Sequence, residues 1–291
     1  MSIDKLQEKI RKTKNPSVID FGVLPVHIPP HLLEEEGNFV AAYRRFCREL
    51  LLGLKDTVPA VRFSLGAFSL LGALGVDQLT DILHYAKELG YYVLLDGPEA
   101  LSQQAAASAA EALLTTDAFS CDGVIVSAYI GSDAVRPYVK LLKQSGKSLF
   151  VVTRTANKTA PEVQDLLTGS RLVHTAVADL AGRLGEPLMG KCGYSQVAAV
   201  GAASSADSLR AMRAKQKCLF LLLDGYDYPN ANAKNCSFAF DNLGHGAVAC
   251  AGSTVTAAWY HEELDSREYV SWATQAAERM KKNLTRYVTV L

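Results

Sequence analysis

The sequence lacks a surplus of charge of either sign. Its 291 residues include 30 Lys and Arg and 30 Asp and Glu, so the formal net charge is zero. A balanced chain has no bulk electrostatic attraction for nucleic acid or for an anionic membrane surface. Long hydrophobic runs are also missing, because stretches such as Cys218–Leu223 are far too short to cross a bilayer. We therefore expect neither nucleic acid nor a membrane as a partner.

Paired cysteines are absent as well. The six cysteines are scattered, no two form a CxxC pair, and several lie in apolar segments. This pattern is typical of reduced core thiols rather than of a disulfide framework. The first fifteen residues, MSIDKLQEKIRKTKN, have the pattern of a charged amphipathic helix and not of a signal peptide. Together these features predict a cytoplasmic protein.

Several motifs that carry well-known chemistry do not occur. There is no His/Cys/Glu cluster with metal-ligand spacing, no GxSxG nucleophile elbow and no GxxxxGK[ST] phosphate loop. We expect no metal and no cofactor.

What the chain does contain is a regular alternation of two patterns. Short, β-rich apolar runs occur at 17–23, 60–65, 91–96, 123–128, 148–153, 196–201, 218–223 and 247–252. Segments with helical periodicity separate them, for example DQLTDILHYAKELG, in which Gly90 provides a stop. Strands that alternate with helices predict βα units and a parallel sheet. Eight such runs favour an α/β fold of the (β/α)8 TIM-barrel type with an extra N-terminal helix, in one domain over residues 1–291. An open doubly wound sheet is the alternative.

In a (β/α)8 barrel the chemistry lies just after each strand, at the mouth. Residues at these points have hydroxyl, charged or amide side chains. The candidates at the mouth are Arg62, Asp96, Ser127, Tyr129, Arg154, Asn157, Asp224, Tyr226, Asp227 and Ser253.

The order of these segments resembles the orotidine 5′-phosphate decarboxylase family, in its longer bacterial branch. VPAVRFSLGAF and YAKELGYYVLLDG look like the segments of that family around its second and third strands. VSAYIGSDAVRPYV, GKSLFVVTRTANKTAPEVQDL and YSQVAAVGAASSADSLRAMR are similar to its later segments, in the right order and at the right spacing. The resemblance implies a barrel that pairs through its mouth as a homodimer, or as a heterodimer with a related barrel.

The family's catalytic residues are not all present at the matching positions. The resemblance implies two lysines and two aspartates, one of the aspartates coming from the partner subunit. Arg62 stands at the position of the first lysine, and Asp-x-Lys-x-x-Asp becomes Asp96-Gly97-Pro98-Glu99-Ala100-Leu101. Asp96 remains, whereas Pro98 replaces the proton donor and Leu101 the partner's aspartate. The Gly-x-Asp-Pro pattern of strand one becomes Gly22-Val23-Leu24-Pro25.

The phosphate-binding positions implied by the resemblance have changed too. The Gly-rich loop after strand seven becomes LDGYDYPNANAKN, with Asp227 in place of a glycine and Pro229 in place of a glutamine. The Ser-Arg pair after strand eight becomes Ser253-Thr254. Carboxylates repel a phosphate dianion unless a cation intervenes, and Lys234 is one candidate for that cation.

Three hypotheses follow for function. The chain is a non-decarboxylating pseudoenzyme with a binding or regulatory role and a small polar, pyrimidine-like ligand. Alternatively it is a working decarboxylase that converts OMP to UMP in pyrimidine biosynthesis, a carbon-carbon lyase. The third possibility is an enzyme with a changed substrate on the same barrel mouth. A purely structural interpretation stands beside these: Arg62 and Asp96 form an internal ion pair that plugs the barrel, and Tyr226 and Tyr228 cover its mouth.

Overall fold

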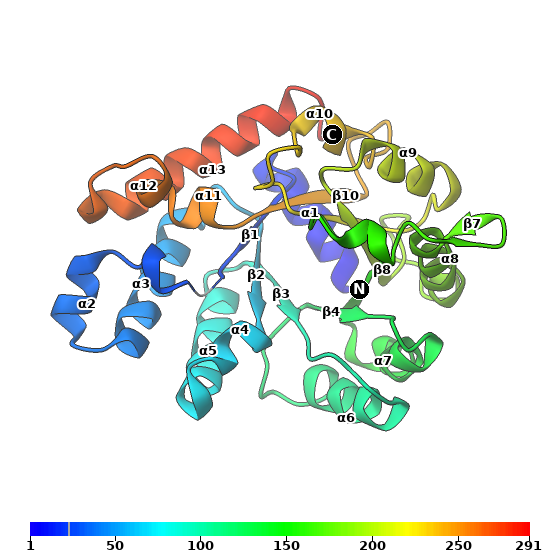
Figure 1. Cartoon of the computed structure of the whole chain (residues 1–291), viewed down its shortest axis with the longest axis horizontal. Helices are drawn as coiled ribbons and strands as arrows, with labels where there is room; N and C mark the ends of the chain where they lie inside the picture. The colour runs from blue at the N-terminus through cyan, green and yellow to red at the C-terminus, as the bar shows by residue number, and fades with distance from the viewer. Residues whose placement is uncertain (23) are drawn as a thin grey trace.

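Eight parallel strands close into a barrel that helices surround (Figure 1). The computed structural model describes residues 1–22 and 24–291. The hydrogen-bonded order of the strands around the barrel is β1-β10-β9-β8-β5-β4-β3-β2. The strands are β1 (Ser17–Asp20), β2 (Ala60–Ser64), β3 (Tyr92–Asp96), β4 (Gly123–Ser127), β5 (Ser148–Val152), β8 (Val197–Ala202), β9 (Leu221–Asp224) and β10 (Ala247–Ala251). The predicted (β/α)8 barrel is confirmed, and the open sheet is wrong.

The strands are apolar along almost their whole length because both of their faces are covered. Every residue of β8 and β10 is buried, between the barrel interior on one side and the helices on the other. Two predicted strand ranges differ from the structure by more than one residue at an end. β1 ends at Asp20, and residue 23 of the predicted range lies outside the described residues. β9 begins only at Leu221, so Cys218 lies in the preceding turn and is exposed.

The helices begin and end where the sequence provides caps. Ser102 starts α6 by accepting a hydrogen bond from the amide of Ala105 at 3.1 Å, as its position before the helix predicts. Gly90, with φ +89°, follows α5. The helices of the barrel and its loops are α2 (Pro30–Glu36), α3 (Phe39–Leu54), α4 (Leu65–Ser69), α5 (Gly72–Glu88), α6 (Gln103–Leu114), α7 (Ser132–Ser145), α8 (Val173–Gly185), α9 (Ala206–Lys215), α10 (Ala233–Ser237), α11 (Ser253–Thr256), α12 (Ala258–His261) and α13 (Tyr269–Thr285). In the described part of the chain, no helix combines the length and apolar character that a membrane crossing requires.

The extra N-terminal helix α1 (Ser2–Thr13) lies across the amino ends of the barrel strands. Its Ser2 hydroxyl donates to the carbonyl of Asp122, directly before β4, at 2.7 Å. On the same helix, Gln7 accepts a hydrogen bond from the amide of Gly246, directly before β10, at 3.0 Å. Ile3, Leu6 and Ile10 of this helix are fully buried. Because α1 covers this end, the carboxyl ends of the strands form the accessible mouth.

Candidate functional site at the mouth of the barrel

Arg62 lies at the centre of the mouth and is bound by two carboxylates. Its guanidinium donates to Asp20 Oδ2 at 2.8 Å and to Asp224 Oδ1 at 2.6 Å. Asp20 ends β1 and is the register partner of Arg62, while Asp224 ends β9. Although burial works against its charge, the acidic groups around it raise the pKa of Arg62 well above its usual value. The arginine is therefore a permanent, internally paired cation.

The predicted ion pair between Arg62 and Asp96 is wrong. Asp96 stands in register with Ser64, two residues further along β2 than Arg62, so the two side chains start from different levels of the barrel. The guanidinium instead reaches across to the strands β1 and β9. Sequence reasoning did not select Asp20, although a polar residue at the end of the apolar run SVID was the available signal.

Asp96 is a partly buried carboxyl with an unusual affinity for protons. Its pKa is raised to about 6, and burial is the largest cause. Arg62 acts against this rise, whereas the carboxylates of Asp20 and Asp224 contribute to it. Asp96 therefore exchanges its proton near neutral pH, which is a property of acid–base groups in active sites.

Asp227 binds the start of the segment that follows β10. One of its oxygens accepts a hydrogen bond from the amide of Gly252 at 2.7 Å, and the other accepts one from the hydroxyl of Thr254. Next to them, the Ser253 hydroxyl is hydrogen-bonded to Nε2 of His261 at 3.0 Å. Two hydrogen-bond donors at this end of β10, the Gly252 amide and the Thr254 hydroxyl, are thus bound by an acid of the protein itself.

Ser127 and Tyr129 follow β4 on the opposite side of the mouth. The Ser127 hydroxyl accepts a hydrogen bond from the amide of Tyr129 at 3.3 Å. The Tyr129 side chain is 85% exposed. Ser127 is therefore fixed at the strand end, whereas Tyr129 projects into solvent.

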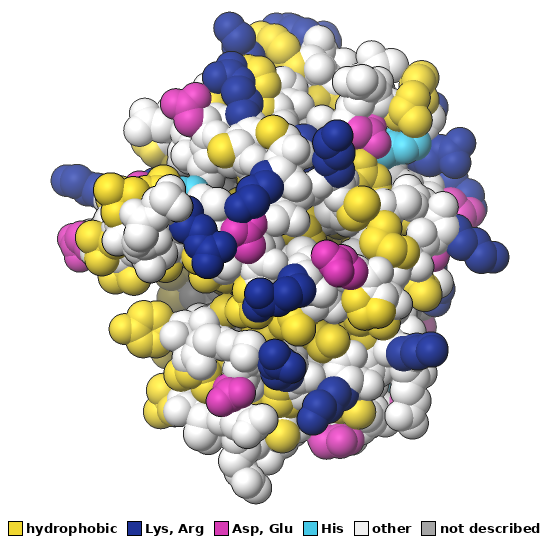
Figure 2. Space-filling view, turned by 90° about the vertical axis from the view of Figure 1, so that its right-hand side faces the viewer, with side chains coloured by type: hydrophobic (Ala, Val, Ile, Leu, Met, Phe, Trp, Pro, Cys, Tyr) yellow, Lys and Arg dark blue, Asp and Glu magenta, His cyan; other side chains and the backbone are white. Residues whose placement is uncertain are grey.

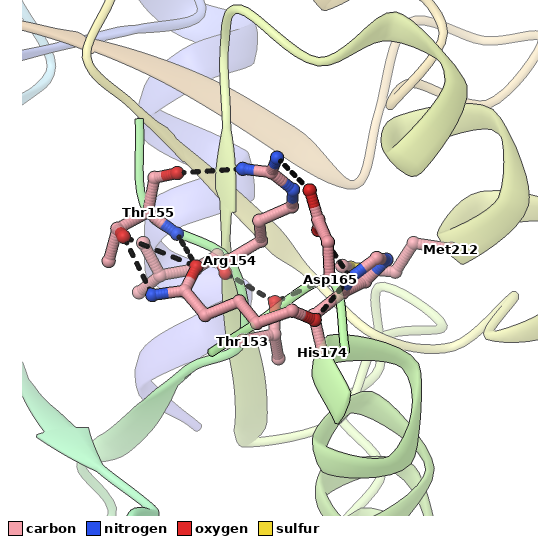
Figure 3. A network of polar contacts seen from close by, with 8 residues as sticks. Thr153, Arg154, Thr155, Asp165, His174 and Met212 are labelled. Carbon is pink, nitrogen blue, oxygen red and sulfur yellow. Dashed lines mark hydrogen bonds and ion pairs between the residues drawn. The ribbon is translucent and has the colours of Figure 1, made fainter. Parts of the chain in front are cut away.

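Arg154, which follows β5, is bound within its own loop (Figure 3). The guanidinium donates to Asp165 at 2.7 Å and to the carbonyl of Thr155 at 3.1 Å. Asp165 also faces Nδ1 of the buried His174 at 3.3 Å, at the start of α8. The Asn157 amide oxygen accepts from the Thr155 hydroxyl at 2.5 Å. Asp165 was not predicted because its loop is long and has no strong periodicity, and His174 was not predicted because it lies at the start of α8, away from the strand ends.

Tyr226 and Tyr228 follow β9. Tyr226 lines a hollow together with Val255 of α11 and Met280 of α13. Burial raises its pKa to about 12. Tyr228 lies against Gly225, a residue with φ +77°. Coverage of the mouth by the two tyrosines stays a prediction.

The histidines near the mouth do not form a metal site. The ring of His27, in the short helix η1 (Pro25–His27), lies 5.4 Å from the ring of His261, centroid to centroid. Burial, and then the neighbouring His261, lower the pKa of His27. Among residues 1–22 and 24–291, no three His, Cys, Asp or Glu side chains are grouped so that they could hold a metal ion.

Comparisons with known proteins agree with the resemblance that the motifs indicate. The chain is 26% identical over 286 residues to a protein of Clostridium novyi named orotidine 5′-phosphate decarboxylase, and the match covers 98% of both chains. It is 27% identical over 236 residues to a protein of the same name from Rhodopirellula baltica, with 79% and 78% covered. No family model matches the chain.

Solved structures show the same fold. The OMP decarboxylase of Leishmania donovani superimposes with a TM-score of 0.71 at 20% identity, with 97% of this chain and 100% of that chain covered. The orotidine 5′-monophosphate decarboxylase of Plasmodium berghei gives a TM-score of 0.74 at 12% identity, with the same coverage. The predicted resemblance in sequence and fold is confirmed.

Proposed function

We propose that this homologue of the orotidine 5′-phosphate decarboxylases does not decarboxylate OMP and instead binds a small polar, pyrimidine-like ligand at its mouth. The observation that carries the proposal is the state of Arg62, which Asp20 and Asp224 hold as a permanent cation. A guanidinium does not release its proton at neutral pH, so Arg62 cannot replace a lysine as an acid. Pro98, at the position of the family's proton donor, has no side-chain proton to give.

The charges of the mouth also disfavour an anionic nucleotide. Asp20 and Asp224 bind Arg62, and both of these carboxylates raise the pKa of the nearby Asp96. A further carboxylate in this low-dielectric region raises the electrostatic free energy unless a cation accompanies it. A substrate that carries both a carboxylate and a phosphate dianion therefore binds less well here than an uncharged pyrimidine.

The hydrogen bonds that Asp227 accepts are a second argument that this protein does not bind phosphate. Its carboxylate takes the Gly252 amide and the Thr254 hydroxyl, which are the kinds of donor that bind phosphate oxygens. A phosphate would have to displace this internal acid. We propose that the ligand is not phosphorylated, and that Ser127, Tyr129 and Asn157 contribute its polar contacts.

We also propose that the chain forms a homodimer, or pairs with a related barrel, through the mouth side. Large apolar side chains are exposed on the segments that follow β2, β3 and β4, which are neighbours in the barrel: Leu70, Leu74, Leu101 and Tyr129. Exposed apolar side chains on neighbouring segments are typical of a protein interface. The single-domain organisation and the cytoplasmic location stay predictions.

A working decarboxylase is the second candidate. The names of the relatives favour it, and so does Asp96, whose pKa of about 6 makes it a possible source of a proton near neutral pH. In that mechanism Asp96 would protonate the carbon left by carbon dioxide, without help from an ammonium group. A carboxyl that ionises near neutrality among other carboxylates supplies less stabilisation to a carbanion than a lysine ammonium does.

The two candidates are separated by a decarboxylation assay on OMP together with thermal-shift titrations. A ligand that binds only the native state raises Tm as its concentration increases. We expect no turnover of OMP, no shift with UMP or inorganic phosphate, and a saturable shift with uridine or uracil. Turnover that disappears in Asp96→Ala would establish the decarboxylase instead.

The role of Asp227 is tested by two matched variants. Asp227→Gly frees the Gly252 amide and the Thr254 hydroxyl, so we expect a thermal shift with UMP that the wild-type protein lacks. Asp227→Asn keeps a side chain of the same shape in place and should stay insensitive to UMP. If Asp227→Gly gains no response, the donors at the end of β10 are not a masked phosphate site.

A further inference from the structure

A cavity lies far from the mouth, at the amino ends of β8 and β9. Its volume is about 640 Å³, which is within the range of sites for small organic ligands. One wall is the last part of α8, and the opposite wall is the turn 216–219 that precedes β9. Nothing in the proposed function of the mouth uses this cavity.

The wall formed by the turn is fixed by hydrogen bonds from Arg213. Arg213, at the end of α9, donates to the carbonyls of Gln216, Lys217 and Leu219, at 3.3, 3.1 and 2.8 Å. The same guanidinium donates to the carbonyl of Gly246 at 2.7 Å and so ties the turn to the strand that follows β9 in the barrel. Because one buried arginine fixes three carbonyls of the turn, the cavity is preformed, which lowers the entropic cost of binding.

The other wall is α8, which packs closely against the turn and against Ser195 because it has glycines at the contacts. A Cβ at Gly182 would lie 2.3 Å from Oε1 of Gln216, and one at Gly185 would lie 2.4 Å from Oγ of Ser195. Larger residues would therefore force α8 away from the barrel. Met189 and Leu219 add apolar surface. The body of a ligand here meets helix backbone and apolar side chains.

The charges around the cavity favour an anion. Asp179 is already bound by Lys215 at 2.7 Å and by Arg171 at 2.8 Å. Of the remaining charged side chains in the lining, Arg183 and Lys217 are cationic and Glu186 is anionic, so three cations and two carboxylates line the cavity. No ion pair between described residues involves Arg183 or Lys217. Figure 2 shows the side of the molecule on which α8 and α9 lie, with many Lys and Arg side chains around apolar surface.

We infer that this cavity binds a small organic anion with an apolar body and an acidic group that pairs with Arg183 and Lys217. The cavity supplies both parts of the recognition, a preformed apolar wall and a surplus of cations that have no internal partner. The site is separate from the mouth, so this inference does not depend on the function proposed there.

The thiol of Cys218 can report whether this cavity is occupied. Cys218 lines the cavity and is the one cysteine of the six that is exposed. The experiment uses anilinonaphthalene sulfonate as the anionic apolar probe, N-phenylnaphthylamine as its neutral counterpart, and inorganic phosphate as an anion without an apolar body. Probe affinity is measured by fluorescence, and occupancy of the cavity by the rate at which a disulfide reagent modifies Cys218.

We expect the sulfonate probe to slow the modification of Cys218 with the dissociation constant that fluorescence gives. Lys217→Glu and Arg183→Glu should each weaken that binding about tenfold, because each reverses a charge next to the acidic group. Lys55→Glu, an equal charge reversal on an exposed residue at the end of α3, should change it less than about twofold. All three positions are exposed, so the variants should fold.

Three results would overturn the inference. Fluorescence that saturates without slowing the modification of Cys218 would place the probe elsewhere. Equal affinity for the neutral probe would remove the role of the cations. Protection of Cys218 by phosphate at the same concentration would show that the apolar body contributes nothing.

Discussion

At the scale of single residues, Arg62 holds together the strand ends that form the mouth. Its side chain is mostly buried and joins Asp20 of β1 to Asp224 of β9. We expect Arg62→Met to lower the free energy of unfolding at pH 7 by about 3 kcal/mol, because it leaves two carboxylates without their cation. Arg62→Lys keeps the charge but loses the forked geometry, and should cost about half as much. Urea unfolding of the three proteins measures both, and equal stability of Arg62→Met and wild type would contradict the prediction.

Asp96 should make stability depend on pH in an unusual direction. In the folded protein Asp96 keeps its proton up to a pKa of about 6, whereas in the unfolded chain it releases the proton near its ordinary pKa of 3.8. Raising the pH from 4 to 7 therefore favours the unfolded state through this residue. We expect Asp96→Asn to gain about 1 to 3 kcal/mol over wild type as the pH rises through this window, and to differ little at pH 4. Urea unfolding at several pH values tests this, and a difference that does not change with pH would refute it.

The sequence located the charged residues of the mouth but not their partners. Arg62, Asp96 and Asp224 could be predicted because each lies in or directly after an apolar run, and strand ends meet at one face. The pairing depends on register and on which strands become neighbours when the barrel closes, and a linear pattern contains neither. For this reason Arg62 was paired with Asp96 on the next strand along the chain, while Asp20 was overlooked.

At the scale of elements, the local stability of the segment 153–172, the excursion of the chain between β5 and α8, depends on one polar network. It contains η2 (Ala160–Glu162) and the two-stranded hairpin of β6 (Leu167–Thr168) and β7 (Arg171–Leu172), whose residues are largely exposed. Arg154 anchors it through Asp165, which also faces the buried His174 (Figure 3). Few apolar contacts stabilise such a segment, so its stability is local.

We expect Asp165→Ala to loosen this excursion without unfolding the barrel. The variant leaves the Arg154 guanidinium unpaired, which costs about 1 to 2 kcal/mol and corresponds to a rise of about tenfold in local opening. Amide hydrogen exchange over residues 155–172 should accelerate by that factor, while exchange in β4 and β8 should stay as in wild type. Asp207→Ala, at an exposed i,i+3 ion pair of α9, is the control and should leave the excursion unchanged. Faster exchange throughout the barrel would show that the network supports the whole fold instead.

The positions of the strands along the sequence were easier to predict than the residues at which each strand begins and ends. Each of the eight apolar runs overlaps a barrel strand, because burial on both faces demands continuous apolar residues. The start of β9 was placed too early, since CLFLLL is apolar throughout but its first residues form a turn that Arg213 binds. The hairpin of β6 and β7 was not predicted, because two-residue strands have no periodicity to detect.

At the scale of the whole molecule, the two ends of the barrel differ in what covers them. Helix α1 covers the amino end of the strands and buries its apolar side chains there. At the mouth, Leu101 is 89% exposed and Tyr129 is 85% exposed. A monomer that covers one end and leaves apolar side chains in solvent at the other has a surface suited to a partner. Symmetric pairing of two identical mouths is the simplest closed arrangement.

We therefore expect sedimentation equilibrium to give a mass of about twice the 31.4 kDa of the chain. Leu101→Glu should dissociate the dimer, because it places a charge at the centre of an apolar interface against its symmetry mate. Leu167→Glu is the matched control: Leu167 is 74% exposed, but it lies in the hairpin between β5 and α8, away from the segments that follow β2, β3 and β4. A wild-type protein that sediments as a monomer, or a control variant that dissociates as readily as Leu101→Glu, would contradict pairing through the mouth. If Leu101→Glu dissociates the dimer and its Tm then becomes independent of protein concentration, the mouth is completed by a second copy of the chain.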